Sequence, residues 1–359
     1  MATVVIAPDS FKGSISARNA TEALARGWRS ARPQDTIFSL PMADGGEGLL
    51  DAIHSVRPDA TLHIEEVTGP HGRPVSATWL QLSDSTAVIE MAQSSGLPLM
   101  DALDPMGATS RGLGELITRA IEAGSERILV GVGGSATTDA GMGMLEGLGA
   151  AVNRSGGVVA DVTSIDVSAL PRPPKEGITV LADTKAVFAD APAVFGPQKG
   201  ASDEQVGELS AIFERLASHG PSPTAARMPG SGAAGGVAWA LASYMGAVIV
   251  EGSRYVGNLL GLGKVLDGAD FVVTGEGRFD ATSLSGKVVG YVHHLANAYG
   301  VPGAVVAGDS SETHCGSWPV KKILELAADA GDSMGRSDHY LEHIGASLAR
   351  DLPRNGLTT

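Results

Sequence analysis

The chain has 359 residues, of which 43% are hydrophobic and 18% charged; this balance excludes a disordered chain and predicts two folded domains rather than one. The formal net charge of −14 and the 4% of aromatic residues argue against nucleic acid as a partner, because that binding needs basic and stacking surfaces. A single cysteine excludes an internal disulfide framework, and no histidine or cysteine partners at metal-ligand spacing accompany it.

The first expected strand begins within three residues of Met1, which leaves no room for a signal peptide, so we expect a cytoplasmic protein. The uncharged run over 230–250 is too rich in glycine and serine for a membrane span. It predicts a glycine-rich turn, a short buried helix over 237–245 and a strand, so we expect no membrane partner. The state of assembly is expected to be a monomer or a homodimer.

In chain order, one sequence pattern recurs: an apolar run of strand length, a glycine-rich loop and a stretch with helical periodicity. It occurs at "TVVIA" (3–7) with a helix over 15–31, at "TIFSLP" (36–41) with a helix over 49–55, at "RILVGV" (127–132), at "FVVTGEG" (271–277) and at "GAVVAG" (303–308). This alternation is typical of a parallel α/β sheet, whose ligands bind at the carboxyl ends of the strands.

Between the second and third of these units the pattern changes. Residues 63–92 contain two or three alternating strands joined by Gly/Pro turns, which predicts an antiparallel meander. The proline-rich segments 170–177 and 219–230 are interpreted as exposed connections or a lid. The fold class is therefore α/β with two domains: a discontinuous Rossmann/flavodoxin-like parallel-sheet domain (1–68 plus 266–359), interrupted by a second α/β domain (69–265).

The glycine-rich loops carry the candidate chemistry, although no G-x-G-x-x-G can be read in "GVGGSA" (131–136), which follows a strand, and no G-x-x-x-x-G-K-[ST] occurs in the chain. Lys12, Lys199 and Lys287 each lie next to a glycine in such loops, a placement that indicates phosphate or carboxylate contacts. Carboxylates recur in the same loops, at Asp9, Asp44, Glu47, Asp139, Glu276 and Asp280. Cations, carboxylates and open backbone are the groups that phosphoryl transfer requires.

Each loop also has a purely structural interpretation. Ser14 or Ser16, and Ser135 or Thr137, are candidate helix N-caps, and Glu47 in a first helical turn is favoured by the helix dipole. Six such loops in one chain are harder to explain by folding alone, because folding does not require acidic and basic residues to recur at strand ends. The six are 9–14, 43–48, 133–141, 195–201, 230–236 and 274–280 with 285–287.

The longer motifs resemble the successive signatures of the bacterial type I glycerate kinases (glycerate 2-kinases), in that family's order. They extend from the first strand to about residue 310: "IAPDSFKGSISA", "PMADGGEG", "VTGPHGRPV", "AVIEMAQSSGL", "VGVGGSATTDAGMGMLEGLGA", "AVFGPQKGA", "GSGAAGG" and "VTGEGRFDATSLSGK". The resemblance implies ATP-dependent phosphorylation of D-glycerate, usually to 2-phosphoglycerate, with magnesium. It also implies two domains, one of them Rossmann- or flavodoxin-like.

Residue roles follow from this resemblance together with the chemistry of the loops. The expected catalytic residues are Asp9, Lys12, Asp280 and Lys287. The expected ATP-binding residues are Gly133, Gly134, Ser135, Thr137, Gly275, Gly277 and Arg278. The expected acceptor-binding residues are Ser10, Asp44, Gly45, Gly46, Glu47, Gln198, Lys199 and Gly235. Magnesium is expected to bind Asp44, Asp183 and Glu276.

The chain departs from the family pattern at several points. Thr138 and Ala140 replace an asparagine and a glycine of the family's "GGSATNDGG", the segment before "AVFGPQKGA" is shortened, and the tail after about residue 310 is atypical. Because threonine offers no amide, the acceptor could instead be another hydroxy acid, a polyol or a cyclitol. A catalytically silent ligand-binding homologue is a further alternative, and a nicotinamide-dependent oxidoreductase is disfavoured by the missing dinucleotide loop.

Overall fold

The computed structural model describes residues 1–154 and 162–352, whose packing divides the chain into two compact units. Unit 1 is Met1–Asp44, Asp51–Pro58 and Ser253–Thr359, and unit 2 is Gly45–Leu50 and Asp59–Gly252. The helices α2 (Leu49–Val56) and α10 (Gly252–Leu259) contain points where the chain passes between units. These boundaries differ from the expected joints at 68/69 and 265/266, because the strand over 61–68 pairs within the unit 2 sheet.

The parallel strands of unit 1 have a flavodoxin-like order. Neighbours in its sheet run β13-β14-β12-β11-β1-β2, and all pairs are parallel except the edge pair of β13 with β14. In chain order the parallel strands therefore read 2-1-3-4-5, with the switch point between β1 and β11. The predicted parallel-sheet fold class is confirmed. Besides α2 and α10, the elements of this unit are β1 (Thr3–Ile6), α1 (Ala17–Ala31), β2 (Thr36–Ser39), α11 (Leu262–Leu266), β11 (Phe271–Phe279), η5 (Ala281–Leu284), α12 (Val288–Ala298), β12 (Gly303–Ser310), β13 (His314–Cys315), β14 (Trp318–Lys322), α13 (Ala330–Gly335) and α14 (Ser337–Asp351).

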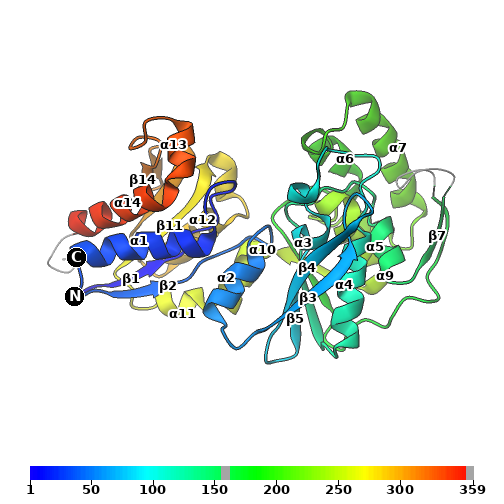
Figure 1. Cartoon of the computed structure of the whole chain (residues 1–359), viewed down its shortest axis with the longest axis horizontal. Helices are drawn as coiled ribbons and strands as arrows, with labels where there is room; N and C mark the ends of the chain where they lie inside the picture. Colours follow the sequence, from blue (N-terminus) through cyan, green and yellow to red (C-terminus); the bar gives the residue numbers. More distant parts are fainter. Residues whose placement is uncertain (155–161, 353–359) are drawn as a thin grey trace. The chain divides into compact units, whose positions relative to one another are not determined.

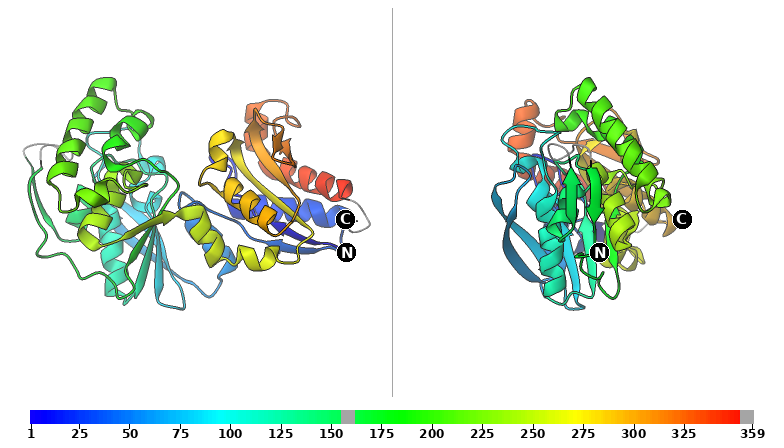
Figure 2. Two further views of the ribbon diagram at one scale, coloured as in Figure 1. Left: turned by 180° about the vertical axis from the view of Figure 1, so that it is seen from behind. Right: turned by 90° about the vertical axis from the view of Figure 1, so that its right-hand side faces the viewer.

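Helices cover both faces of this sheet, because successive strand residues point to opposite sides. On one face Val273 packs in a core with Leu24 and Trp28 of α1 and Leu341 of α14. Helices α1 and α14 lie side by side there (Figure 1), and they approach so closely that a Cβ on Gly27 would clash with the α14 backbone. Helix α12 lies in front of the strands when the unit is seen from behind (Figure 2, left).

The sheet of unit 2 is mixed, in the order β10-β9-β6-β5-β4-β3. The predicted meander over 63–92 is confirmed, since β3–β4–β5 pair antiparallel, whereas β5, β6, β9 and β10 pair parallel. A separate two-stranded sheet, β7 with β8, is visible in Figure 2, right. The elements of this unit are β3 (Thr61–Thr68), β4 (Pro74–Gln81), β5 (Thr86–Glu90), α3 (Ala92–Ser95), η1 (Leu97–Leu99), α4 (Arg111–Glu122), β6 (Arg127–Gly131), α5 (Met142–Gly147), β7 (Ala151–Arg154), β8 (Val162–Asp166), β9 (Ile178–Ala182), η2 (Phe188–Asp190), α6 (Ala191–Phe195), η3 (Pro197–Lys199), α7 (Asp203–His219), α8 (Pro223–Ala226), η4 (Ala233–Gly236), α9 (Val237–Met245) and β10 (Val248–Glu251).

The segment over 230–250 has the predicted helix over 237–245 followed by a strand. The segment over 219–230, interpreted as an exposed connection or a lid, also contains the short helix α8, in which Ala225 and Ala226 are buried. Ser222 caps this helix by accepting a hydrogen bond from the Ala225 amide (3.2 Å). Among the described residues, no helix combines the length and apolarity needed to cross a membrane.

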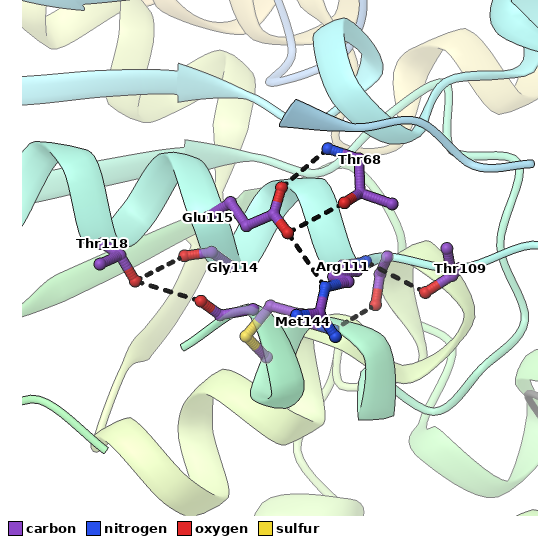
Figure 3. Close-up of polar contacts among 9 residues, drawn as sticks. Thr68, Thr109, Arg111, Gly114, Glu115, Thr118 and Met144 are labelled. Atoms are coloured by element: carbon purple, nitrogen blue, oxygen red, sulfur yellow. Dashed lines mark hydrogen bonds and ion pairs between the residues drawn. The ribbon is translucent and has the colours of Figure 1, made fainter. Parts of the chain in front are cut away.

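Helix α4 is anchored to its neighbours by a small polar network (Figure 3). The carboxylate of Glu115 accepts hydrogen bonds from the amide (2.7 Å) and hydroxyl (2.9 Å) of Thr68 at the end of β3, and from Nε of Arg111 (3.0 Å). The Thr118 hydroxyl contacts the carbonyl oxygen atoms of Gly114 (3.0 Å) and Gly147 (3.3 Å). These bonds fix α4 against both the meander and α5.

Candidate active site

The loop after β1 is a tight turn that presents Lys12 to solvent. Phe11 is 1% exposed and belongs to the core of unit 1, while its backbone N–H donates to the carbonyl oxygen of Ile15 (2.9 Å). Gly13, with φ of +76°, supplies the left-handed residue that this turn needs. The following helix begins at the predicted cap, because the Ser16 hydroxyl accepts a hydrogen bond from the Asn19 amide (3.3 Å).

The segment "TGEGRF" is part of strand β11 rather than a loop, which corrects the sequence-based interpretation of where that strand ends. Its glycines serve close backbone approach: a Cβ on Gly275 would clash with the carbonyl oxygen of Val306, and one on Gly277 would lie 3.3 Å from the Lys12 amide nitrogen. The Asp9 amide donates to the carbonyl oxygen of Gly275 (2.8 Å), which ties the β1 loop to this strand. The side chains that follow β1 and β11 are therefore held together at the switch point of the sheet.

A cavity of about 370 Å³ lies at this place, and all residues that line it belong to unit 1. The site residues predicted from the sequence that it brings together are Asp9, Ser10, Lys12, Asp44, Glu276, Gly277, Arg278 and Lys287. The other residues of the lining are Phe11, Ser14, Gly308, Asp309, Leu324, Ala330, Ser333, Met334 and Ser337.

Two carboxylates of this cavity, Asp9 and Glu276, have raised pKa values. Burial, and next to it the charge of Asp44, raises the pKa of Asp9 well above its usual value, although Lys12 opposes this shift. Burial also raises the pKa of Glu276 to about 7, against the opposing effects of Ser283 and Lys287. Atom Oε1 of Glu276 is buried and has no hydrogen-bond partner among the described residues. Buried carboxylates with raised pKa values in a cavity are typical of functional sites.

Two predicted site residues of unit 1 do not line this cavity. Gly275 lies inside β11, where the approach of Val306 explains the glycine. Asp280 caps η5: its Oδ1 accepts hydrogen bonds from the amide (2.9 Å) and hydroxyl (2.6 Å) of Thr282, and the side-chain bond is the main cause of its lowered pKa. The structure thus gives Asp280 a local structural role.

In unit 2 a buried lysine joins two of the predicted loops. Lys199 is 2% exposed, and its Nζ donates to the Ser135 hydroxyl (3.0 Å) and to the carbonyl oxygen of Thr137 (2.6 Å). Burial lowers the pKa of Lys199 to about 7, while the charge of Asp139 acts in the opposite direction. The fully buried hydroxyl of Thr137 has no hydrogen-bond partner within the described chain.

The glycines of these loops allow close packing of backbone on backbone. A Cβ on Gly133 would clash with Gly46, whose neighbour Gly45 accepts a hydrogen bond from the Gly133 amide (3.1 Å). Gly235, with φ of +60°, packs so tightly that a Cβ would clash with the carbonyl oxygen of Thr137. Gly134 adopts φ of +71°. Much of the glycine signature of unit 2 therefore has a structural explanation.

Asp139 organises the start of α5 and is more central to unit 2 than the sequence indicated. Its Oδ2 accepts hydrogen bonds from the amide and hydroxyl of Ser110 (both 2.8 Å) and from the Gly143 amide (3.1 Å), and its Oδ1 accepts from the Gly141 amide (3.0 Å). The prediction that Ser135 or Thr137 caps this helix was wrong, because the cap position is Gly141 and Asp139 binds the free amides instead.

The side-chain hydrogen bonds described for Lys199 do not include the remaining predicted residues of unit 2. Glu47 and Gln198 are exposed, and Asp183 follows β9 in a half-buried position. Thr138, the departure from the family pattern, is fully buried, and its hydroxyl is without a hydrogen-bond partner in residues 1–154 and 162–352.

Sequence reasoning missed several residues of the unit 1 cavity. Asp309 lies in β12, and the rule that ligands bind at strand ends could have found it, because "GAVVAG" was recognised as a strand. Leu324, Ala330, Ser333 and Met334 come from a stretch with no motif, so no sequence signal pointed to them.

A flavodoxin-like sheet whose switch point presents three cations and several carboxylates in one cavity defines a protein that binds a phosphorylated ligand. The chain belongs to the glycerate kinase family, whose sequence model matches residues 4–353. Members of this family are kinases, phosphotransferases that act on an alcohol group.

Individual relatives agree with this assignment. The chain is 39% identical over 372 residues to a glycerate kinase of Bacillus subtilis (strain 168), covering 97% of both chains. It is 39% identical over 327 residues to a glycerate 2-kinase of Escherichia coli (strain K12), covering 86% of both. Its fold matches a crystal structure of a protein assigned as glycerate kinase 2 from Salmonella typhimurium LT2, with a TM-score of 0.79, 34% identity and 97% coverage of both chains.

Proposed function

We propose that this chain transfers the γ-phosphoryl group of ATP to D-glycerate and forms 2-phosphoglycerate. The observation that carries this proposal is the unit 1 cavity, which combines Lys12, Arg278 and Lys287 with buried carboxylates at the switch point. The named relatives are glycerate kinases, which supports glycerate as the acceptor. We propose the cytoplasm as the compartment of this reaction, because ATP and magnesium are abundant there.

The three cations of the cavity have the chemistry to bind the triphosphate. Lys12 and Arg278 are exposed and Lys287 is half-buried, so they can reach a charged ligand in the cavity. Fixed positive charge around a transferring phosphoryl group stabilises the negative charge that develops in the transition state. The predicted ATP-binding residue Gly277 supports the same role, because its lack of a side chain lets β11 approach the Lys12 loop.

The carboxylates fit a magnesium ion. Within the described residues no group of three or more His, Cys, Asp or Glu side chains forms a metal site. Magnesium, however, is commonly held by one or two carboxylates together with phosphate oxygens and water. The buried, unpartnered Oε1 of Glu276 fits such a ligand, and we propose Glu276 and Asp44 as the protein ligands. When bound, the ion would neutralise charge on the phosphate groups.

We propose Asp9 as the group that accepts the proton of the acceptor hydroxyl. It lines the cavity, and its raised pKa brings its basicity closer to neutral pH than that of an ordinary aspartate. Asp280 is less suited to this role, because Thr282 occupies its Oδ1. Ser10, Gly45, Gly46, Glu47, Gln198, Lys199 and Gly235 stay predicted acceptor-binding residues. Asp183 stays a predicted metal ligand.

The experiment that tests this function is a coupled assay of ADP release with magnesium, ATP and a panel of acceptors: D-glycerate, L-glycerate, tartronate, a linear polyol and a cyclitol. We expect turnover on D-glycerate, and product analysis by NMR should show the phosphate at C2. Turnover on a cyclitol alone would contradict glycerate as the acceptor. If no acceptor gave ADP release, the proposed kinase activity would be contradicted.

Lysine variants test where the phosphates bind. Lys12→Ala and Lys287→Ala should each lower kcat/KM by about 10²-fold or more. The matched control is Lys264→Ala, which removes an exposed lysine of unit 1 outside the cavity. Equal activity of all three variants would contradict the assignment.

A further inference from the structure

The lining of the unit 1 cavity includes two chemically different groups of residues. Asp9, Asp44, Glu276, Lys12 and Lys287 act on one another electrostatically. The second group is formed by the segment over 324–337, which contributes Leu324, Ala330, Ser333, Met334 and Ser337. This segment therefore adds an apolar, uncharged wall to a strongly charged site.

A three-carbon hydroxy acid is polar over its whole length, so it has no apolar surface to pack against such a wall. A nucleoside triphosphate needs both groups, since it joins a polyanionic chain to a flat base with apolar faces. The volume of about 370 Å³ lies within the range of small-molecule sites. We propose that the wall formed by Leu324, Ala330 and Met334 is the nucleobase subsite, an inference that rests on the proposed kinase function and assigns the nucleotide to unit 1.

The wall is held in place by hydroxyl groups that are already engaged. The hydroxyl of Ser14 donates to the carbonyl oxygen of Met334 (3.1 Å) and contacts the hydroxyl of Ser337. The Ser337 hydroxyl in turn donates to the carbonyl oxygen of Ser333 (2.6 Å). These bonds connect the β1 loop, which carries Lys12, to α13 and α14, so that the phosphate-binding loop and the base-binding wall form one connected structure.

Because these hydroxyl groups are already hydrogen-bonded, the wall has few polar groups that could recognise the edge of a base. Met334 is 51% exposed and offers an apolar side chain, and Ser333 of α13 is also a lining residue of the cavity. A hydroxyl both donates and accepts hydrogen bonds, so it suits either purine edge. Strong discrimination needs buried polar groups that the wrong ligand leaves unpaired. We therefore expect GTP to bind within about tenfold of ATP.

The test measures binding of ATP, GTP and inorganic tripolyphosphate by calorimetry, with magnesium, to the full chain and its variants. Met334→Ala should weaken the binding of ATP and of GTP by roughly tenfold, because apolar contact with the base is lost. The affinity for tripolyphosphate should stay unchanged, because tripolyphosphate has no base. Ala330→Trp, at an exposed position, should weaken both nucleotides by filling the subsite. Leu326→Ala is the matched control: Leu326 is 44% exposed, lies outside the cavity, and its loss should change none of the three affinities.

The outcomes separate this inference from the proposed function. If the wild-type chain binds ATP and neither Met334→Ala nor Ala330→Trp weakens it, the nucleobase subsite is wrong and the kinase function stands. If the variants weaken the binding of tripolyphosphate as much as the binding of ATP, the subsite is also wrong, because the substitutions would then affect phosphate binding rather than base binding. A wild-type chain that binds neither ATP nor tripolyphosphate would overturn the proposed function itself.

Discussion

Nζ of Lys199 and the hydroxyl of Ser135 lie 3.0 Å apart in the interior of unit 2, although 64 positions separate them in the sequence. The same amine reaches the carbonyl oxygen of Thr137, so one buried lysine fixes the position of the "GGSAT" loop relative to the "FGPQKGA" loop. Such a network is stable only while the amine keeps its partners, because a buried unpaired polar group destabilises the fold.

Lys199 should make the stability of the protein depend on pH. Its pKa is about 7 in the folded protein and 10.5 in its ordinary state, so between these pH values the unfolded chain binds more protons than the folded one. The free energy of unfolding should therefore rise with pH over this window, by up to about 1.4 kcal/mol per pH unit. Lys199→Met should remove this slope in urea unfolding at pH 7, 8 and 9, whereas the exposed control Lys264→Met should retain it. If the free energy of unfolding of Lys199→Met depends on pH as it does in the unsubstituted protein, the lowered pKa of Lys199 is not the cause of the slope.

Glu276 should show the opposite dependence on pH. Its pKa is raised from 4.5 to about 7 in the folded protein, so the folded state holds a proton that the unfolded chain has lost between those values. The free energy of unfolding should fall as the pH rises through this window. Glu276→Gln should therefore raise Tm at pH 8, by the equivalent of about 2 kcal/mol, while it lowers kcat/KM by at least about 10²-fold. A variant that is both less stable at pH 8 and fully active would contradict this role of Glu276.

Two glycines with left-handed backbone angles should respond differently to alanine. A Cβ at Gly235 (φ +60°) would clash with the carbonyl oxygen of Thr137, whereas one at Gly246 (φ +66°) meets nothing within 4 Å. Gly246→Ala should lower the free energy of unfolding by only about 1 kcal/mol, the backbone effect alone. Gly235→Ala should lower it by about 3 kcal/mol or more, because the loop must also move. Similar values for the two variants in chemical unfolding would disprove the tight packing at Gly235.

The network in Figure 3 makes Glu115 a structural rather than a catalytic carboxylate. Glu115→Ala leaves the amide and hydroxyl of Thr68 without their acceptor and should lower the free energy of unfolding by about 2 kcal/mol. Thr118→Val is the control, with an expected loss of about 1 kcal/mol, because it removes only a donor to two carbonyl groups. Neither change should alter the KM for ATP or for the acceptor; a change in KM at Glu115 would point to a role in the site.

Much of the fold could be predicted from local patterns. The apolar run over 3–7, the cap at Ser16 and the buried helix over 237–245 each depend on short-range periodicity and capping, and all are present in the structure. The end of β11 was misjudged, because the glycines of "TGEGRF" are typical of a loop when only the sequence is seen. Their reason is the long-range approach of β12 and of the Lys12 loop, which no local pattern records.

The same distinction applies to the candidate site. The charged residues of the unit 1 cavity, except Asp309, were found because acidic and basic side chains recur beside glycine at strand ends. The apolar wall was missed, because Leu324 and Met334 look like ordinary core residues in the sequence, and only the tertiary fold places them beside Lys12. Asp139 was seen as a carboxylate, but two of its four hydrogen bonds come from Ser110, a residue 29 positions away.

The pairing of α1 with α14 has a consequence for synthesis of the protein. Helix α1 begins at residue 17 and α14 ends at residue 351, so the ribosome must make nearly the whole chain before unit 1 can close its core. The main segment of unit 2, Asp59–Gly252, is continuous and emerges from the ribosome before the segment of unit 1 that begins at Ser253. Because domains generally fold as units during translation, unit 2 should fold while the apolar strand and helix of the N-terminal segment still wait for their partners. During that interval Trp28 and its neighbours are exposed, and this nascent state is the one most in need of a chaperone.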